Sequence, residues 1–250
     1  METREQPVGV VTGGAGAIGK RICAALAKEG FGVVVVDLAA EAVRGVAEGL
    51  SGERHAGIAA SVTDSAAVKA LASEICAHYG RCDVLVNCAG TTRFVAHNDL
   101  DGLDDHLIDL ILATNVRGPF AMVRALRPLL DKSTQAGGAV VVNITSIAAL
   151  TAMGSNIMYC ASKAALENIT KSLARALAPR IRVVSVAPGL ADTDFIKSMD
   201  QRWRDEQLER TPLKRLAAPD DIAAAIIAIV KHLKYTTGTI IAVDGGRPLS

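Results

Sequence analysis

Short runs of valine and isoleucine alternate with longer helix-forming stretches along the whole chain of 250 residues. A strand that alternates with a helix forms right-handed βαβ units and a parallel sheet. We therefore expect one α/β domain over residues 1–250, a doubly wound parallel sheet of roughly seven strands flanked by helices. The expected strands are Val8–Val11, Val33–Val36, Ile58–Ala60, Val84–Val86, Ala139–Ile144, Val183–Val186 and Thr239–Val243. The expected helices are Ala17–Glu29, Ala40–Gly49, Asp64–Tyr79, Asp104–Leu130, Ile157–Ala178 and Asp220–Leu233.

Three further features of the sequence indicate a kink, a helix start and an irregular segment. Gly118-Pro119 lies inside the stretch Asp104–Leu130 and predicts a kink there. Pro219-Asp220-Asp221 predicts a helix start, because proline suits the first turn and acids favour the positive end of the helix dipole. The segment Leu190–Leu213 is charged, lacks a clear period and contains the only tryptophan. We expect this segment, about residues 190–213, to be an insertion or a lid.

Composition excludes several classes of function. The formal net charge is +1, with no basic stripe, which argues against nucleic acid as a partner. The longest apolar stretch, Ile222–Val230, is too short to cross a bilayer. The five cysteines form no CxxC pair and no zinc spacing, so we expect no metal and interpret them as small buried hydrophobes. Free cysteines of this kind are typical of a reducing compartment, so we expect the protein in the cytoplasm.

A glycine-rich turn, Thr12-Gly13-Gly14-Ala15-Gly16-Ala17-Ile18-Gly19, follows the first expected strand. Glycines let the backbone approach a pyrophosphate, and the helix that starts here directs its free N–H groups at the phosphates. Asp37 ends the second strand, where an acid accepts bonds from ribose hydroxyls and repels a 2′-phosphate. Position 38 is a leucine, and the turn contains no Arg or Lys that could bind that phosphate. The set predicts NAD rather than NADP, although the turn alone could be an ordinary tight connection.

A tyrosine and a lysine four residues apart stand at the start of a predicted helix, in Tyr159-Cys160-Ala161-Ser162-Lys163. They share one helix face, and a nearby cation should lower the pKa of the phenol for proton exchange near neutral pH. Ser146, at the end of a strand, could donate to a carbonyl oxygen that gains charge. Asn115 lies inside a helical stretch, where asparagine is mildly unfavourable, so we expect its side chain to make a specific hydrogen bond. Each residue alone could be a surface contact or a helix cap.

Taken together, these blocks resemble classical short-chain dehydrogenases/reductases over essentially the full length. The matching blocks are the TGGAGAIG turn, Asn87-Cys88-Ala89-Gly90, Asn115-Val116-Arg117-Gly118, Ser146, YCASK, Pro188-Gly189, Thr193 and Val243-Asp244-Gly245-Gly246. The resemblance implies a Rossmann fold and a catalytic tetrad. Tyr159 would move the proton, Lys163 would bond the nicotinamide ribose, Ser146 would hold the substrate oxygen, and Asn115 would anchor a water.

The same resemblance implies the cofactor contacts and the assembly. A homotetramer is common in this family, with Asp104–Leu130 and Ile157–Ala178 forming one interface and the C-terminal strand another. Together with the residue-based reasoning, the expected NAD contacts are Gly13, Gly16, Ala17, Ile18, Gly19, Asp37, Leu38, Val62, Asn87, Ala89, Gly90, Tyr159, Lys163, Pro188, Gly189 and Thr193.

Three positions depart from the family pattern. Ala17 stands where the turn usually has glycine, a spacing that also suits the extended subclass of epimerases and dehydratases. That subclass has longer chains and lacks the 13-residue spacing from Ser146 to Tyr159. Cys88 replaces a usual asparagine, and Ser61 stands where an acid or amide often holds the adenine.

The substrate is expected to be a secondary alcohol or ketone of moderate size, because the candidate pocket is mostly apolar with a few hydrogen-bonding groups. A sugar or polyol and an apolar ketone or hydroxy compound stay open as substrates. Two other readings stay open: a non-catalytic NAD-binding sensor or scaffold, and an NADPH-dependent ketoreductase. The candidate substrate contacts are Thr91, Phe94, Ile147, Met153, Asn156, Leu190, Phe195 and Trp203.

Overall fold

Seven parallel strands form one sheet in this computed structural model, which describes residues 6–193, 196 and 200–249. The strand order is β3-β2-β1-β4-β5-β6-β7, and every neighbouring pair is parallel. The expected strand count and the parallel direction are confirmed. The strands are β1 (Val8–Thr12), β2 (Gly32–Asp37), β3 (Ala56–Ala59), β4 (Val84–Asn87), β5 (Ala139–Ile144), β6 (Ile181–Pro188) and β7 (Ile240–Val243).

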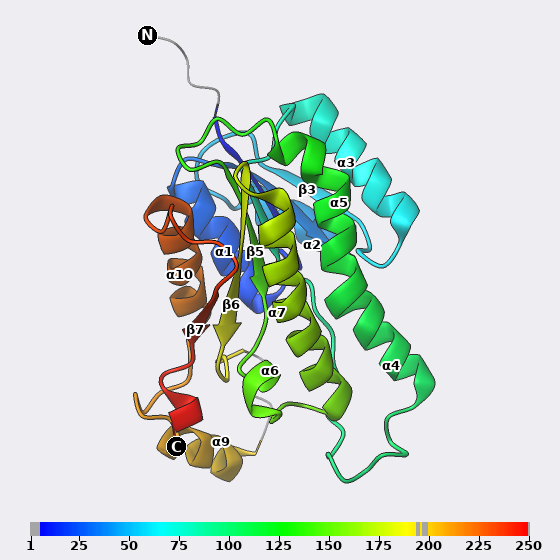
Figure 1. Cartoon of the computed structure of the whole chain (residues 1–250), viewed down its shortest axis with the longest axis vertical. Coiled ribbons are helices and arrows are strands. Elements are labelled where there is room, and N and C mark those ends of the chain that lie inside the picture. Colours follow the sequence, from blue (N-terminus) through cyan, green and yellow to red (C-terminus); the bar gives the residue numbers. More distant parts are fainter. Residues whose placement is uncertain (1–5, 194–195, 197–199, 250) are drawn as a thin grey trace.

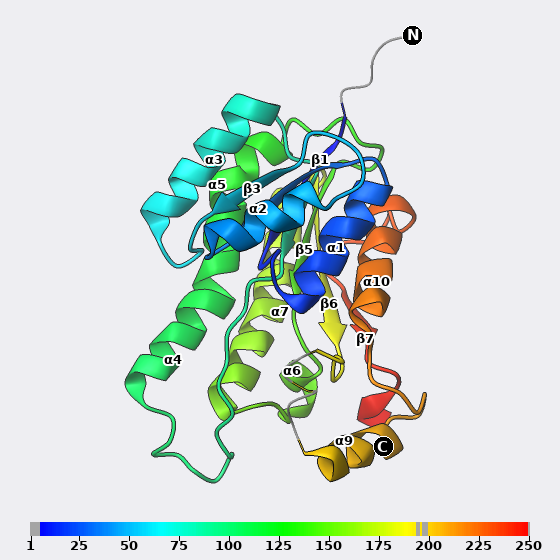
Figure 2. The ribbon, with the colours of Figure 1, turned by 180° about the vertical axis from the view of Figure 1, so that it is seen from behind.

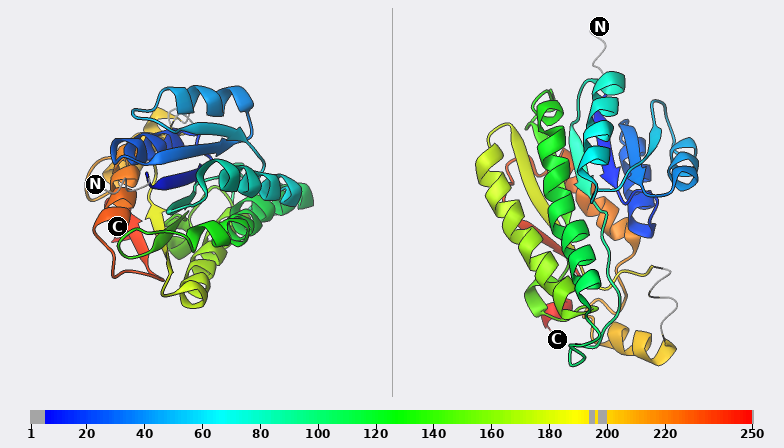
Figure 3. Two further views of the ribbon diagram at one scale, coloured as in Figure 1. Left: turned by 90° about the horizontal axis from the view of Figure 1, so that it is seen from above. Right: turned by 90° about the vertical axis from the view of Figure 1, so that its right-hand side faces the viewer.

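Helices cover both faces of the sheet, as Figures 1 and 2 show from opposite sides. One face carries α3 (Ser65–Tyr79), α5 (Gly118–Leu130) and α7 (Ile157–Leu177), with α4 (Asp105–Leu112) continuing toward α5. The other face carries α1 (Ala17–Lys28), α2 (Ala40–Glu48) and α10 (Pro219–Lys231). The views of Figure 3 show these helices flanking the sheet. The short elements are α6 (Ala148–Thr151), α9 (Gln201–Glu209) and the 3₁₀ turn η2 (Arg247–Leu249).

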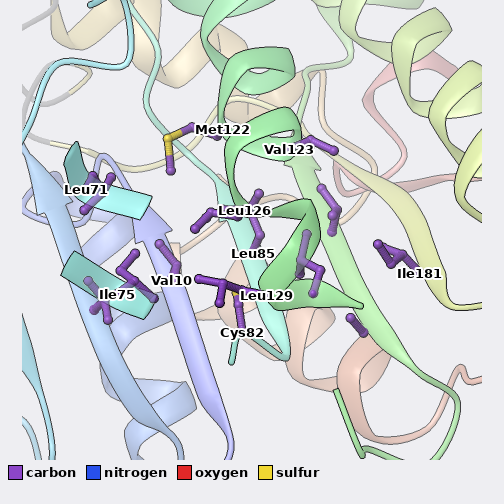
Figure 4. Close-up of a cluster of buried hydrophobic side chains, with 14 of the residues drawn as sticks. Val10, Leu71, Ile75, Cys82, Leu85, Met122, Val123, Leu126, Leu129 and Ile181 are labelled. Carbon is purple, nitrogen blue, oxygen red and sulfur yellow. The ribbon is translucent and has the colours of Figure 1, made fainter. Parts of the chain in front are cut away.

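Each face of the sheet has its own apolar core, because successive strand residues point to opposite faces. Val10 and Leu85 belong to the cluster under α3, α5 and α7, while Val11 and Val86 belong to the cluster under α1 and α10. Figure 4 shows the first cluster, where Leu71 and Ile75 of α3 lie toward the strands together with side chains of α5. Strands buried on both faces explain why their sequences are nearly continuous valine and isoleucine.

The long stretch 104–130 breaks before the expected kink. A π-helical turn η1 (Ala113–Arg117) separates α4 from α5, and Pro119 stands in the first turn of α5. Pro119 has no N–H to donate to the carbonyl of residue 115, the partner that a regular α-helix would require. The predicted interruption is therefore present, but the π-turn upstream of the proline produces it.

The segment 190–213 contains a helix that its sequence pattern did not predict. Asp200 caps α9, because its carboxylate accepts the N–H of Trp203 at 3.1 Å. No residue of α9 is buried. A helix that is polar on every side leaves no apolar period, which is the signal we relied on.

Two local expectations have different outcomes. The helix start at Pro219 is confirmed, and Asp221 accepts the N–H of Ala218 at 2.8 Å. The expectation that every cysteine is buried is wrong for Cys76, which is exposed on α3. None of the five cysteines forms a disulfide.

Candidate active site

The glycine turn after β1 is seated against the end of β4. Gly13 has a φ of +65°, and a Cβ there would come within 2.8 Å of the backbone of Ala89. The hydroxyl of Thr12 accepts the N–H groups of Cys88 and Ala89, both at 3.2 Å. The sequence reasoning did not single out Thr12, although its place directly before the first glycine was a usable signal. The turn and the Asn87–Gly90 block therefore form one surface.

Helix α1 begins at this turn without a side-chain cap. Gly16 is its N-cap residue and has no side chain to accept the free N–H groups, whereas α3 and α4 are capped by Asp64 and Asp104. A Cβ on Gly19 would lie 2.0 Å from the carbonyl oxygen of Gly13, so only glycine permits this approach. Gly16 and Ala17 are exposed, and Ile18 is half-buried. Uncapped N–H groups beside a glycine cradle fit a pyrophosphate.

Asp37 ends β2 beside this turn. Its carboxylate accepts the N–H of Ala15 at 3.1 Å and the N–H of Leu38 at 2.7 Å. The side chain of Leu38 is exposed. The acid therefore ties the glycine turn to the second strand and places a negative charge where a ribose edge would lie.

The next two strands contribute the rest of the candidate cofactor surface. Val62 follows β3 and packs against Gly118, where a Cβ would come within 2.8 Å of the valine side chain. Asn87 is buried and donates to the side chain of Asn143 at 2.8 Å. Gly90 is exposed, and a Cβ there would lie 3.6 Å from the Nζ of Lys163. Because parallel strands end at one edge, these segments converge there.

Tyr159, Ser146 and Lys163 meet at the same edge. Ser146 lies just beyond β5, close enough to Tyr159 for its side chain to lower the pKa of the phenol. Lys163 is buried, and its Nζ donates to the carbonyl oxygen of Ile144 at 2.9 Å. The same Nζ lies 5.6 Å from the centre of the Tyr159 ring. The spacing of four residues on α7 therefore brings the phenol and the ammonium to one place, as expected.

The titration behaviour of this pair corrects one expectation. Burial raises the pKa of Tyr159 above its ordinary value, and the hydrogen bond with Ser146 opposes that rise. Burial lowers the pKa of Lys163 to about 8. The net shift of the phenol's pKa is therefore upward, because desolvation outweighs the effect that lowers it.

Asn115 lies fully buried in the π-turn η1. Its Oδ1 accepts the N–H of Thr91 at 2.9 Å, and its Nδ2 donates to the Thr91 carbonyl at 3.0 Å and to Ser162 Oγ at 3.1 Å. Ser162, which the sequence reasoning did not single out, also donates to the Tyr159 carbonyl at 2.7 Å. The amide of Asn115 is thus engaged by protein groups.

The segment after β6 completes the edge. Pro188 ends the strand, and the N–H of Gly189 donates to the carbonyl of Val243 at 3.0 Å. Thr193 is half-buried, and its N–H donates to the carbonyl of Ala191 at 2.8 Å. Ala191 pairs with Ala217 in an isolated parallel bridge. The start of the expected lid is therefore fixed to the turn before α10.

The expected substrate contacts divide into three groups. Phe94, Met153 and Trp203 are exposed, and the half-buried residues are Thr91, Ile147 and Leu190. Asn156 does not fit the role we expected, because it is fully buried and caps α7 instead of lining an open surface. Phe195 lies outside the described residues.

Two classes of site find no support in the described part of the chain. Within residues 6–193, 196 and 200–249, there is no group of three His, Cys, Asp or Glu side chains that could hold a metal ion. None of the helices described there has the length and apolar character needed to span a bilayer.

Sequence comparison identifies relatives along nearly the whole chain. Residues 13–247 match the family described as enoyl-(acyl carrier protein) reductase. D-Threitol dehydrogenase of Mycolicibacterium smegmatis is 36% identical over 96% of this chain and 92% of its own length. The 3-oxoacyl-(acyl-carrier-protein) reductase of Thermotoga maritima is 33% identical over 97% of this chain and 98% of its own.

Solved structures show the same fold. A 3-ketoacyl-(acyl-carrier-protein) reductase of Brucella melitensis, complexed with NADH, superposes with a TM-score of 0.87 at 30% identity, covering 97% of this chain and 98% of its own. The Pseudomonas aeruginosa RhlG/NADP active-site complex superposes with a TM-score of 0.89 at 31% identity, covering 96% of both chains.

Proposed function

Because this chain belongs to the short-chain dehydrogenase/reductase family of oxidoreductases, we propose that it interconverts a secondary alcohol and a ketone with NAD(H). The observation that carries the proposal is the meeting of Tyr159, Ser146 and Lys163 at the strand edge next to the glycine turn. A phenol, a neighbouring hydroxyl and a buried ammonium are the groups that proton exchange with an alcohol oxygen requires.

The residues present fit a dinucleotide. The uncapped start of α1 would hold the pyrophosphate, Asp37 would accept the adenosine ribose hydroxyls, and Val62 would wall the adenine. Lys163 would bond the nicotinamide ribose, with Asn87, Gly90, Gly189 and Thr193 around the ring. When bound, the nicotinamide supplies the hydride chemistry that no protein side chain provides.

The protein's own groups handle the oxygen and its proton. The hydroxyl of Ser146 donates to the substrate oxygen and holds it beside the phenol of Tyr159. In oxidation the phenolate of Tyr159 takes the proton of the substrate hydroxyl, and in reduction the phenol returns it. The charge of Lys163, near the ring, stabilises the phenolate when it forms. Asn115 fixes the backbone beside this proton path through its three bonds.

The negative charge of Asp37 favours NAD over NADP as the cofactor. The Asp37 carboxylate would lie beside a 2′-phosphate, and the neighbouring Leu38 offers no cation to offset the repulsion. We expect Asp37→Ser to narrow the preference for NADH over NADPH at least tenfold. Titration of nicotinamide fluorescence with each cofactor measures it. Asp37→Asn is the matched control for the turn, since its amide oxygen can still accept the Ala15 N–H after the charge is lost. An unchanged preference in both variants would place cofactor selection elsewhere.

Removal of the phenolic oxygen tests the chemical step. We expect Tyr159→Phe to lose at least a thousandfold in kcat with ketones and polyols, because the proton donor is gone, while NADH binds as in wild type. The assay panel should include threitol and a 3-oxoacyl thioester, one from each class of relative. The exposed Tyr235→Phe is the control. Substantial activity in Tyr159→Phe would rule out the assigned acid/base.

Two other functions are distinguished by the same experiments. A non-catalytic sensor would bind NADH and turn over no substrate, and Tyr159→Phe would change nothing. An NADPH-dependent ketoreductase would bind NADPH more tightly than NADH in the titration. The intact Asn115, Ser146, Tyr159 and Lys163 set favours catalysis, because a sensor needs the dinucleotide surface but not the proton-transfer groups.

The proposal includes an assembly of identical chains and a lid. A hollow on the outer side of α4, η1, α5 and α7 is lined by Leu112, Val116, Phe120 and Ile169, among others. Phe120 is 43% exposed there. A second copy would cover this hollow through the same helices, and the edge strand β7 would form another contact. The segment 190–213, with α9 inside it, would close over the substrate.

A further inference from the structure

Asn156 has no exposed surface and makes three hydrogen bonds with its side chain. Its Oδ1 accepts the N–H of Tyr159 at 2.7 Å. Its Nδ2 donates to the Oγ1 of Thr92 at 3.1 Å and to the carbonyl of Arg93 at 2.7 Å. One amide therefore bonds to the backbone of the catalytic tyrosine and to a segment more than sixty positions away in sequence.

That segment, Thr91–Val95, runs from the end of the Asn87–Gly90 block toward α4. It is bonded to the start of α7 twice more, by Thr92 Oγ1 to Ser155 Oγ at 2.5 Å and by Val95 N–H to the Ser155 carbonyl at 2.8 Å. Asn115 holds its other end at Thr91. Since Thr91 and Phe94 are candidate substrate contacts, the position of this segment sets one wall of the substrate site.

Capping alone does not account for asparagine at this position. Serine or aspartate would also accept the Tyr159 N–H and cap α7 equally well. Only an amide supplies, from the same short side chain, an acceptor for α7 and a donor for the Arg93 carbonyl. The donor half of Asn156 faces away from the helix it caps and toward the substrate wall.

We propose that Asn156 is a positioning residue, which holds the substrate wall Thr91–Val95 at a fixed place relative to Tyr159. The inference rests on the proposed function in taking Tyr159 as the acid/base. Tyr159 acts on the substrate oxygen, and Asn156 acts only through Tyr159 and the wall. Its effect should therefore appear in substrate turnover and not in dinucleotide binding.

Two substitutions separate capping from positioning. Asn156→Asp keeps the acceptor for the Tyr159 N–H but puts an oxygen opposite the Arg93 carbonyl. Asn156→Ser keeps a neutral cap and is too short to reach Arg93. We expect both to lower kcat/KM at least tenfold with whichever of threitol or the 3-oxoacyl thioester wild type turns over, while the Kd for NADH changes less than twofold. Asp64→Asn, at the cap of the remote helix α3, is the matched control and should leave kcat/KM unchanged.

Amide hydrogen exchange measures how firmly Asn156 holds the segment Thr91–Val95, and it requires no substrate. We expect faster exchange at residues 91–97 in Asn156→Ser than in wild type, and no change there in Asp64→Asn. Unchanged exchange in that segment would overturn the inference, as would full kcat/KM in both Asn156 variants. A wild type that binds NADH but turns over nothing would overturn the proposed function instead, and the exchange result would still decide whether Asn156 holds the wall.

Discussion

At the residue scale, Lys163 is a cation kept in a place that disfavours its charge. Its ammonium is buried and donates to the neutral carbonyl of Ile144, and its pKa falls to about 8 from an ordinary value of 10.5. A lysine whose charge the proposed function requires thus carries a cost to folding, as functional sites often do. The benefit is a cation close to the ring of Tyr159.

This cost predicts a pH dependence of stability. The pKa of Lys163 is lower in the folded than in the unfolded chain, so the unfolded chain binds more protons between pH 8 and 10.5 and wild type gains stability as pH rises. Methionine binds no proton. We therefore expect the free energy of unfolding of wild type, relative to Lys163→Met, to rise by about 1 kcal/mol from about pH 7 to about pH 9. Urea denaturation at each pH measures it.

The control is the exposed Lys171→Met, which should show no such trend relative to wild type. A difference between wild type and Lys163→Met that stays constant over this pH range would mean that Lys163 does not titrate there.

The residues of the candidate site were predictable where their spacing carries the signal. Tyr159 and Lys163 stand four apart on one helix, and the structure brings them together with Ser146. The sequence could not assign Asn156, because its partners Thr92 and Arg93 are distant in the chain and only the fold brings them near. It also could not give the direction of the Tyr159 pKa, because burial decides that direction.

At the element scale, Arg182 joins three parts of the fold from inside β6. The buried guanidinium donates to the carbonyls of Ile229 and Leu233 near the end of α10, to Thr236, and to Gly137 before β5. Cations stabilise helix C-termini, where the carbonyls have no partner in the helix. Burial lowers the pKa of Arg182, yet arginine keeps its charge in proteins.

Loss of this group should destabilise the fold. We expect Arg182→Met to lower the free energy of unfolding by about 2–4 kcal/mol, because four buried carbonyls lose a charged donor. Chemical denaturation measures the change, with the exposed Arg180→Met as a control that should shift it by less than about 0.5 kcal/mol. A loss below about 1 kcal/mol would show that water or relaxation replaces these bonds.

Elements were predictable where burial leaves a period in the sequence. The strands β1, β2, β4, β5 and β6 are rich in valine because helices cover both of their faces, and β1 at Val8–Thr12 differs from the expected Val8–Val11 by one residue. Helix α9 was missed because it buries no residue. The exact form of the break near Gly118 was missed too, because a proline indicates that a helix is interrupted without indicating a π-turn.

At the scale of the whole molecule, the two helical layers differ in what they leave exposed. The layer of α5 and α7 carries the apolar hollow around Phe120, while α1 and α10 on the other face pair across Arg21 and Asp220. An exposed phenylalanine in an apolar hollow suits contact with another chain.

A charge in the hollow tests the proposed assembly. We expect Phe120→Asp to lower the mass in solution by at least half relative to wild type, because an interface through this hollow would have to bury an unpaired carboxylate. Light scattering after size exclusion measures the mass. Leu100→Asp, at an exposed loop residue away from these helices, should leave it unchanged. Equal masses for wild type and Phe120→Asp would place the contact elsewhere or show that wild type is monomeric.

The π-turn also fixes the length of the chain between Asn115 and α5. An α-helix advances about 100° per residue, so a π-turn acts as one inserted residue that shifts the phase of everything downstream. Asn115 faces Thr91 from inside the turn, and Leu126, downstream of it, faces the sheet. Deleting a single residue from η1 would leave an unbroken helix with one of these two faces turned to the wrong side. Substitutions on the surface of this helix would leave that alignment in place, whereas the insertion or deletion of one residue in η1 would rotate Asn115 relative to the core-facing side of α5.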